Sequence, residues 1–558
     1  MHSRIRLLEK LCGECSYQGD DINEGNTNLI VIACFDMAND ILLSTTPALE
    51  EKASFGDNNS KSDAEAGIYE VSAEKEVTVV QEYTPEQYKK LKRKIDIYLL
   101  PLMWLCYGVQ QVDKTSFSIM ATFGLREDTG LHGQQYSWLA TMFYLAYMCF
   151  EFPSNILLQR WRMGTTLSIF MICWGVIVLC IGFAKNWAHL MTLRALQGMF
   201  ECCISPGFVL IVGSWYTRRE HASRALVFQS ANAGFAVIAD LILYGIGTLE
   251  YSRPDIEAWR YMSYFLGGLT ISVGCLCLYF LGTPTEVPWL SKEEKQMANT
   301  RVLANQSGHD MTGTRVWKWY QVRECLIDPC FYFAGFNAFL VSVPNGGLQT
   351  FGSLINQSFG FTSLEVILYT IPKNVLSVTI FVIVGVITSR WKNLRLIIMA
   401  LGTIPGFIGV LGLSLIETTE STKWTKWGMY FMVTPFVLGL FLAWSLIPSN
   451  VPGRTKRTIT SSFTFIGYCA GNMCGSQIFK SNEAPSYKSG TIGCCACFGL
   501  EFLIIVAWRT TLVLRNRRRD KEMLSDGLTP EEREMQGSIN GESDMTDFEN
   551  PHVSFRSL

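Results

Sequence analysis

Charged residues are concentrated at the two ends of this 558-residue chain. Residues 1–95 hold 28 Asp, Glu, Lys and Arg residues and residues 515–558 hold 17, so 45 of the 96 charges lie in 139 residues and 51 are left for the 419 residues between them. That middle part divides into apolar stretches of about 20 residues, which is the length of a helix that crosses the roughly 30 Å hydrocarbon layer of a bilayer. We therefore expect an all-α protein that passes through the lipid bilayer many times.

Twelve apolar stretches predict twelve transmembrane helices. Their approximate ranges are 96–117, 135–158, 165–184, 189–213, 223–247, 260–281, 328–352, 363–388, 393–416, 426–449, 458–479 and 490–514. The two apolar halves, 96–283 and 328–514, span 188 and 187 residues, and a basic-Trp-basic triplet follows the second helix at 160–162 and the eighth at 390–392. These matching positions favour a duplicated six-helix unit.

The predicted organisation has five parts. A disordered cytosolic tail, 1–92, precedes a six-helix bundle, 93–283, and a cytosolic central loop, 284–327, leads to a second six-helix bundle, 328–515, and a disordered cytosolic tail, 516–558. With the N-terminus inside, the inner loops hold eleven bases and one acid, whereas the outer loops hold eight bases and nine acids. This distribution predicts that both termini are cytosolic, and we expect the plasma membrane as the location.

Several functional classes lack a signature in the sequence. The net charge is −2 and no basic stripe is interleaved with aromatic residues, so a nucleic-acid partner is not expected. The six scattered histidines form no metal motif, and no GxxxxGK[ST] phosphate loop is present. We expect neither an enzyme nor a cofactor, and we expect transport to be driven by an ion gradient.

Four ionisable residues within the predicted spans indicate a mechanism. Asp113 and Lys114 end the first span, and Arg194 and Glu201 lie seven residues apart in the fourth. A charge at membrane depth is costly unless it is paired or functional. Asp113 and Glu201 are the predicted proton carriers, and Lys114 and Arg194 are predicted to bind an anion or to neutralise a carboxylate. The alternative is purely structural pairing, of Asp113 with Lys114 or a neighbouring helix and of Arg194 with Glu201.

Further polar residues in the spans are predicted to contact substrate or to form a gate. The additional substrate-binding candidates are Asn337, Asn345, Gln349, Lys373 and Asn472. Asp240 is a separate candidate for tuning substrate preference. The gating candidates are Glu151, Arg160, Arg162 and Arg390, because Glu151 lies close to the basic loop after the second span and could close a gate by pairing with it.

Longer motifs resemble a known family over nearly all of 93–515. They include Phe-Glu-Phe-Pro-Ser-Asn at 150–155, Arg-Ala-Leu-Gln-Gly-Met-Phe-Glu at 194–201, Gly-Gly-Leu-Gln-Thr-Phe-Gly at 346–352 and Asn-Val-Pro-Gly-Arg-Thr-Lys-Arg at 450–457. In these segments the chain resembles the fungal allantoate-permease family of major-facilitator anion:cation symporters. The resemblance implies a major-facilitator fold of two six-helix pseudo-repeats.

The resemblance also implies an activity and site residues. It implies a proton-coupled carrier of small organic anions, such as ureido acids, vitamins or related carboxylates, without a bound cofactor. An Asp-Arg pair in the first span and an Arg and a Glu in the fourth handle charge in such symporters, and they match Asp113, Lys114, Arg194 and Glu201 here. Lys114 departs from the pattern, because lysine lacks the planar fork of arginine.

The functional prediction is therefore uptake of a small organic anion with protons by alternating access, carried out by a monomer. The alternative is a major-facilitator exporter of a secondary metabolite in exchange for protons. The Gly-Pro-rich antiporter motif is missing from 228–235, which favours import. A nutrient sensor that signals through its tails is a third and less favoured interpretation.

Overall fold

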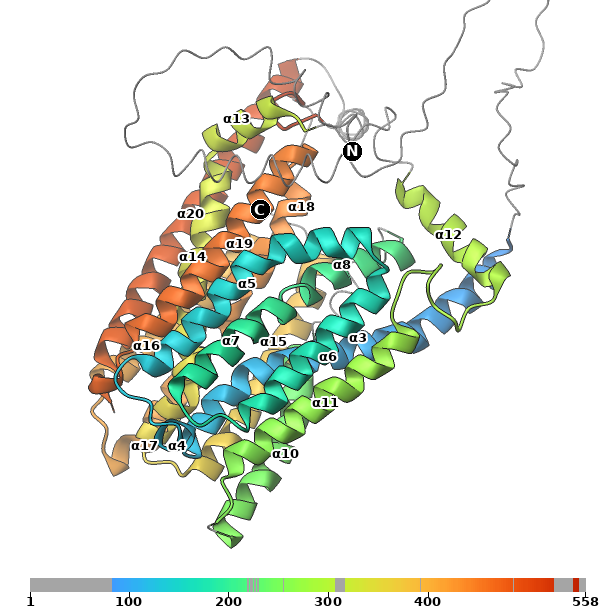
Figure 1. Cartoon of the computed structure of the whole chain (residues 1–558). Helices are drawn as coiled ribbons and strands as arrows, with labels where there is room; N and C mark the ends of the chain where they lie inside the picture. Colours follow the sequence, from blue (N-terminus) through green and yellow to red (C-terminus); the bar gives the residue numbers. More distant parts are fainter. Residues whose placement is uncertain are drawn as a thin grey trace, which may run out of the picture. The chain divides into compact units, whose positions relative to one another are not determined.

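The computed structural model describes residues 83–525 and 545–550, apart from single residues and short stretches within 218–229 and gaps at 254, 307–316, 392 and 485. These residues belong to one compact unit, Thr78–Leu558. Every regular element in this part of the chain is helical (Figure 1). Most of the predicted N-terminal tail, 1–92, lies outside the described residues.

Each predicted span coincides with one helix or with two consecutive helices. In the first half these are α3 (Pro85–Thr122), α5 (Gln135–Arg160), α6 (Met163–Ile181), α7 (Trp187–Glu201) with α8 (Ile204–Trp215), α10 (Ala231–Ser252) and α11 (Ala258–Phe280). In the second half they are α14 (Pro329–Ser358), α15 (Ser363–Arg390), α16 (Arg395–Leu415), α17 (Lys423–Met432) with α18 (Leu438–Asn450), α19 (Arg454–Ile478) and α20 (Lys488–Ser525). Short helices α4 (Leu125–Asp128), α12 (Lys292–Gln306) and α13 (Trp319–Ile327) lie at the ends of the bundle (Figure 1).

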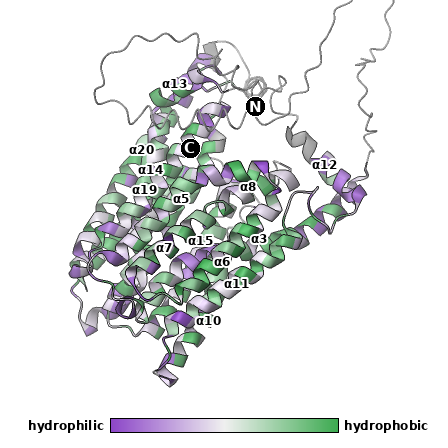
Figure 2. Ribbon diagram, in the orientation of Figure 1, coloured by the Kyte–Doolittle hydropathy of each residue, from purple (hydrophilic) through white to green (hydrophobic). Residues whose placement is uncertain are grey.

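Apolarity is unevenly distributed among these helices. Within the described residues, eight helices are long and apolar enough to cross a membrane, or nine if α13 and α14, which meet at a 70° bend, count as one span. The remaining long helices α3, α5 and α19 fall short because they carry more polar side chains. Apolar residues dominate the middle of the bundle and hydrophilic ones gather toward its ends (Figure 2).

Two helix boundaries differ from the prediction. Helix α3 starts at Pro85 rather than near 93, because Thr84 and Gln87 form a capping box and proline suits the first helical position. Helix α20 continues to Ser525, and residues 545–550 form an ordered turn. The prediction of a fully disordered tail over 516–558 is therefore wrong for these two described segments.

The two halves contact each other through α3 with α14, α5 with α19 and α10 with α15. We call the end of the bundle that carries α4 and α17 the α4 end, and the opposite end, which carries α12 and α13, the α13 end (Figure 1). Hydrogen bonds between the halves include Tyr136 Oη to the Thr350 oxygen at 2.8 Å and Ser363 Oγ to the Thr122 oxygen at 2.6 Å. Both hydrogen bonds lie toward the α4 end, so the two halves are in contact at this end.

Close helix contacts depend on glycine. A Cβ atom on Gly475 of α19 would lie 2.0 Å from the Val343 oxygen of α14, and one on Gly198 of α7 would lie 2.3 Å from the Phe143 oxygen of α5. These glycines let the helix backbones approach as they do in other membrane bundles.

At the α13 end, ion pairs attach the central loop to the first half. Glu220 pairs with Lys92 at 2.6 Å and with Arg301 of α12, and Lys94 pairs with Glu294 at 2.7 Å. Burial by itself raises the pKa of Glu220, but the hydrogen bond from Lys92 and the charge of Arg301 outweigh it and lower this pKa to about 2. Glu220 therefore stays ionised, and it holds α3 and α12 together.

Candidate functional site

The four charged residues from the first and fourth spans lie together in the first half. Asp113 and Lys114 lie on α3, and Arg194 and Glu201 lie on α7. Glu201 is fully buried, and Asp113 and Arg194 are 3% and 5% exposed. A cluster of two acids and two bases from α3 and α7 is thus enclosed by protein.

The pairing within this cluster differs from the sequence expectation. Glu201 Oε1 lies 2.7 Å from Lys114 Nζ, not within ion-pair distance of Arg194. Gln110, one helical turn before Lys114, donates a hydrogen bond to the same oxygen at 3.2 Å. Arg194 and Glu201 share a helical face but are separated by a rise of roughly 10 Å, which favours a partner from another helix.

Arg194 and Asp113 have other neighbours. The guanidinium of Arg194 stacks on the Phe117 ring at 3.6 Å and donates to Gln197 at 2.9 Å. Asp113 accepts a hydrogen bond from Thr270 of α11 at 3.2 Å. The pairing of Asp113 with Lys114, one form of the structural alternative, is not formed, and the hydrogen bond from Thr270 links Asp113 to a neighbouring helix instead.

Three polar atoms in the cluster lack a hydrogen-bond partner among the described residues. They are Asp113 Oδ1, Glu201 Oε2 and Arg194 Nε, and all three are buried. An unsatisfied buried polar atom is costly and calls for a water molecule, a proton or a ligand. Both the carboxylates and the guanidinium group of the cluster can therefore form further hydrogen bonds.

A small cavity lies beside the two bases, at the junction of the halves. It is lined by Lys114, Phe117, Ser118, Ala140, Phe143, Tyr144, Arg194, Gln349 and Thr350. Its volume is about 30 Å³, which is room for one or two water molecules. Gln349, a predicted substrate contact, reaches this cavity from α14 and accepts a hydrogen bond from Tyr144 at 2.9 Å.

The other predicted substrate residues are distributed over the second half. Asn345 donates to Asn472 at 2.8 Å, which joins α14 to α19. Asn337 is fully buried and donates to the Gly439 oxygen of α18 at 3.1 Å. Lys373 of α15 donates to Tyr430 of α17 at 3.1 Å. None of these four candidates lines the cavity, so the structure does not bring the full predicted set together.

Asp240 joins the halves at a separate place. Its carboxylate accepts a hydrogen bond from Asn374 Nδ2 at 2.9 Å, between α10 and α15. Asp240 is 4% exposed. This contact belongs to the inter-half interface rather than to the cavity.

The gating candidates do not form the expected ion pair in this conformation. Glu151 has a buried oxygen without a partner and makes no ion pair within the described residues. Arg162 donates instead to the Glu286 backbone oxygen at 3.5 Å. Arg160 and Arg390 are exposed and lie in the last turns of α5 and α15, where basic residues suit the helix dipole.

Glu501 was not among the sequence predictions. It lies on α20 fully buried, and neither carboxylate oxygen has a partner among the described residues. A Cβ atom on Gly439 would lie 2.2 Å from its Oε1 atom. Its signal was present in the sequence as the one acidic residue within the span 490–514, which also holds Arg509, and a charge within a span is the criterion that selected Glu201. In the described part of the chain, no group of three or more His, Cys, Asp or Glu residues could hold a metal ion.

Comparison with known proteins identifies the family. Residues 103–476 match the family model described as Major Facilitator Superfamily. An uncharacterized transporter of Schizosaccharomyces pombe is 33% identical over 84% of this chain and 89% of its own length. The allantoate permease of Saccharomyces cerevisiae is 29% identical over 85% of this chain and 87% of its own length.

Solved structures agree on the fold. The xylose transporter XylE from E. coli, in a partially occluded inward-open conformation, superimposes with a TM-score of 0.56 at 11% identity over 74% of this chain and 98% of that one. This similarity concerns the fold alone. Together with the matched family model, the twelve spans and the two packed halves, it leads to one conclusion: the chain is a multi-pass membrane transporter that belongs to the Major Facilitator Superfamily, with fungal allantoate permease among its relatives.

Proposed function

We propose that this transporter imports a small organic anion together with protons by alternating access across the plasma membrane, as a monomer with both termini in the cytosol. The observation that carries this proposal is the Lys114–Glu201 ion pair beside a cavity that Arg194 also lines. The name of the allantoate permease supports an anionic substrate, because allantoate is a carboxylate.

The geometry suggests how anion and proton are coupled. Lys114 and Arg194 both face the cavity, so a substrate carboxylate can approach the two bases at once. A carboxylate that takes over Lys114 leaves Glu201 without its counter-ion in a fully buried site. Burying an unpaired charge is unfavourable, so a proton then neutralises Glu201. The anion and the proton therefore enter the site together.

Asp113 extends this scheme by a second acidic group. It lies next to Lys114 in the chain, it is buried, and one of its oxygens lacks a partner among the described residues. We assign Asp113 the role of exchanging the proton, with Thr270 orienting its carboxylate.

The orientation of the chain in the membrane decides which entrance of the transporter is closed in this structure. If the termini are cytosolic, the α4 end faces outward, and its hydrogen bonds from Tyr136 to Thr350 and from Ser363 to Thr122 close the outer entrance. The cavity is too small for a carboxylate of metabolite size. We infer that substrate entry requires these contacts to separate, as rocking of the halves would accomplish.

Uptake measurements test the proposal. Cells that lack their own permeases are given labelled carboxylates, ureides and vitamins at several pH values, with and without an uncoupler. We expect uptake of at least one carboxylate that rises as external pH falls and collapses with the uncoupler. Uptake that depends neither on external pH nor on the uncoupler contradicts proton coupling. Uptake that increases with the uncoupler indicates the export alternative.

Variants connect the measurement to the site. We expect Lys114→Met to abolish uptake and Lys114→Arg to retain a substantial part of it, because arginine can also pair with a carboxylate. Lys185→Gln removes an exposed charge from a loop and is the matched control. Equal uptake by wild type and Lys114→Met would show that this base does not bind substrate.

A further inference from the structure

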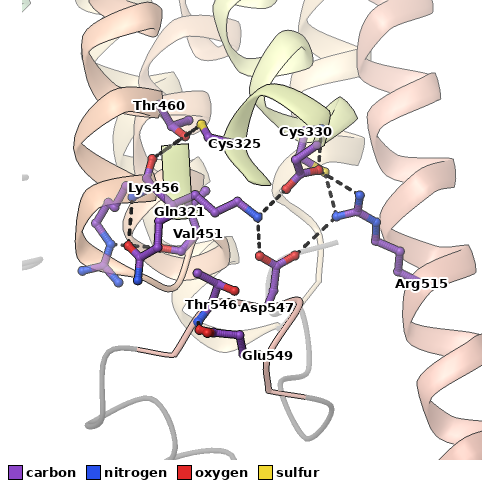
Figure 3. A network of polar contacts seen from close by, with 12 residues as sticks. Gln321, Cys325, Cys330, Val451, Lys456, Thr460, Arg515, Thr546, Asp547 and Glu549 are labelled. Carbon is purple, nitrogen blue, oxygen red and sulfur yellow. Dashed lines mark hydrogen bonds and ion pairs between the residues drawn. The ribbon is translucent and has the colours of Figure 1, made fainter. Parts of the chain in front are cut away.

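A short C-terminal segment packs against the α13 end of the second half (Figure 3). Residues 545–550 form a single turn, closed by a hydrogen bond from the Asn550 nitrogen to the Thr546 oxygen at 2.9 Å. Thr546 and Asn550 are fully buried, and Asp547 is 4% exposed. The segment is therefore seated in the protein rather than lying on its surface.

Asp547 completes a buried charge cluster. Asp547 lies between Lys456 and Arg515 (Figure 3), 2.5 Å from Lys456 Nζ and 3.5 Å from Arg515. Asp328 lies 2.9 Å from Lys456 Nζ and 2.8 Å from Arg515. Two bases and two acids thus balance. Without Asp547, Lys456 would lose one of its two carboxylate partners, although its side chain is only 2% exposed.

The segment contacts helices that are distant in the sequence. Glu549 accepts a hydrogen bond from Tyr320 of α13 at 3.5 Å, and Arg519 of α20 donates to the Asp547 backbone oxygen. At the start of α19, a Cβ atom on Gly453 would lie 2.9 Å from the Thr546 methyl group. Together with Asp328 at the start of α14, these contacts place the segment across the ends of α13, α14, α19 and α20.

The attachment is polar rather than apolar. Thr546, Asp547 and Asn550 are the buried side chains, whereas Phe548 is 53% exposed and meets Lys456 Nζ at 4.5 Å from its ring centroid. Charged hydrogen bonds each contribute only modestly to stability, because the groups lose hydration when the bond forms. A contact built from a few of them can dissociate while the helices stay folded.

We propose that residues 545–550 are an intramolecular ligand of the second half, which holds the ends of four helices together and thereby maintains the turnover rate of the transporter. Helices α14 and α19 also contact the first half, and rocking transport requires each half to move as a rigid body. Release of the segment should therefore slow turnover. None of the contacts described above joins the segment to a cavity residue, so substrate KM should not change, and the proposal does not depend on the identity of the substrate.

Cys325 provides a reporter of docking. It lies on α13, fully buried, with its Sγ atom 3.8 Å from the Lys456 backbone oxygen of α19. It is accessible to a maleimide only if α13 leaves α19. The alkylation rate at Cys325, measured by mass spectrometry on membrane vesicles, therefore reports how often α13 separates from α19.

The experiment compares the full chain with a chain that ends at Ser525. We expect the truncated chain to alkylate Cys325 at least tenfold faster and to transport at least threefold more slowly with unchanged KM. A synthetic peptide of residues 541–558 should restore both values, and the same peptide with Asp547→Asn should require at least tenfold more peptide. Glu522→Gln in the full chain, an exposed acid on α20, is the control and should change neither value.

Two results would overturn the proposal. One is a truncated chain with the alkylation rate and turnover of the full chain. The other is a truncated chain that loses both but is not rescued by the peptide, because the segment would then not be a separable ligand. If the truncated chain does not reach the membrane, full-length Asp547→Asn replaces it. Faster alkylation of Cys325 in that variant supports the proposal, and an unchanged rate contradicts it.

Discussion

The structure and the helical spacing in the sequence give Glu201 different partners, and a measurement can distinguish the two. Helical spacing alone places Glu201 with Arg194, whereas the structure places Glu201 Oε1 2.7 Å from Lys114 Nζ. The perturbations are Lys114→Met and Glu201→Gln, alone and together. Each single change removes one partner of a buried pair and leaves the other charge behind.

The magnitude follows from burial. Glu201 is 0% exposed and the Lys114 side chain is 14% exposed, so the pair is largely dehydrated. Removal of one partner of such a pair costs about 3–5 kcal/mol, because an uncompensated charge stays in the interior. The double variant leaves neither charge, so it should be more stable than the sum of the single effects predicts, by about 1–3 kcal/mol.

Thermal unfolding of the purified protein in detergent measures these differences. For a half of 150–250 residues, about 3 kcal/mol corresponds to a fall in Tm of roughly 6–12 °C. The single and double variants form a double-mutant cycle, and a second cycle with Arg194→Met and Glu201→Gln serves as the comparison. The interaction energy from this second cycle should be below about 1 kcal/mol, because the two side chains are not in ion-pair contact.

Two outcomes would refute this reasoning. Additive effects of Lys114→Met and Glu201→Gln would show that the two charges do not interact in the folded protein. A larger coupling for Arg194 with Glu201 than for Lys114 with Glu201 would restore the pairing that helical spacing suggests.

Three further predictions concern coupling, packing and pH. Asp113→Asn should abolish accumulation of substrate but retain exchange of labelled for unlabelled substrate across the membrane; wild-type accumulation would make Asp113 structural. Gly475→Ala should lower the free energy of unfolding by about 1–3 kcal/mol, because its Cβ atom meets the α14 backbone, whereas Gly213→Ala has no atom within 4 Å and should be tolerated. Glu220, with a pKa lowered to about 2, should stabilise the fold fully above pH 4.5 and lose that effect as the pH falls toward 2, so the Tm difference between wild type and Glu220→Gln should shrink below pH 4.5. A difference that is constant with pH would contradict the ion pairs of Glu220.

The helices could be predicted from the sequence because membrane spanning is a local property. A run of about 20 apolar residues must form a helix in lipid wherever it occurs in the chain. Each of the twelve predicted spans therefore has its helical counterpart. The boundaries at Pro85 and Ser525 were less predictable, since polar helical extensions outside the membrane depend on caps and on neighbouring chain.

The residues of the candidate site could be predicted only in part. Asp113, Lys114, Arg194 and Glu201 stood out as charges in apolar surroundings, and the structure brings them together. Asn337 was selected as a polar amide within a span but lies against Gly439 inside the second half. A polar residue in a span must have a partner, and the sequence does not say on which helix that partner lies.

The sequence by itself therefore determined the number of spans, the duplication of six helices and the few charges that need a counterpart. Tertiary structure alone decided that Glu201 pairs with Lys114, that Gln349 reaches the cavity while Lys373 does not, and that Asp547 returns to Lys456 across 91 residues. The reason is physical: apolar length and helical periodicity act within one helix, whereas an ion pair depends on which side chains of different helices approach within about 4 Å, and the packing of the whole bundle sets that distance.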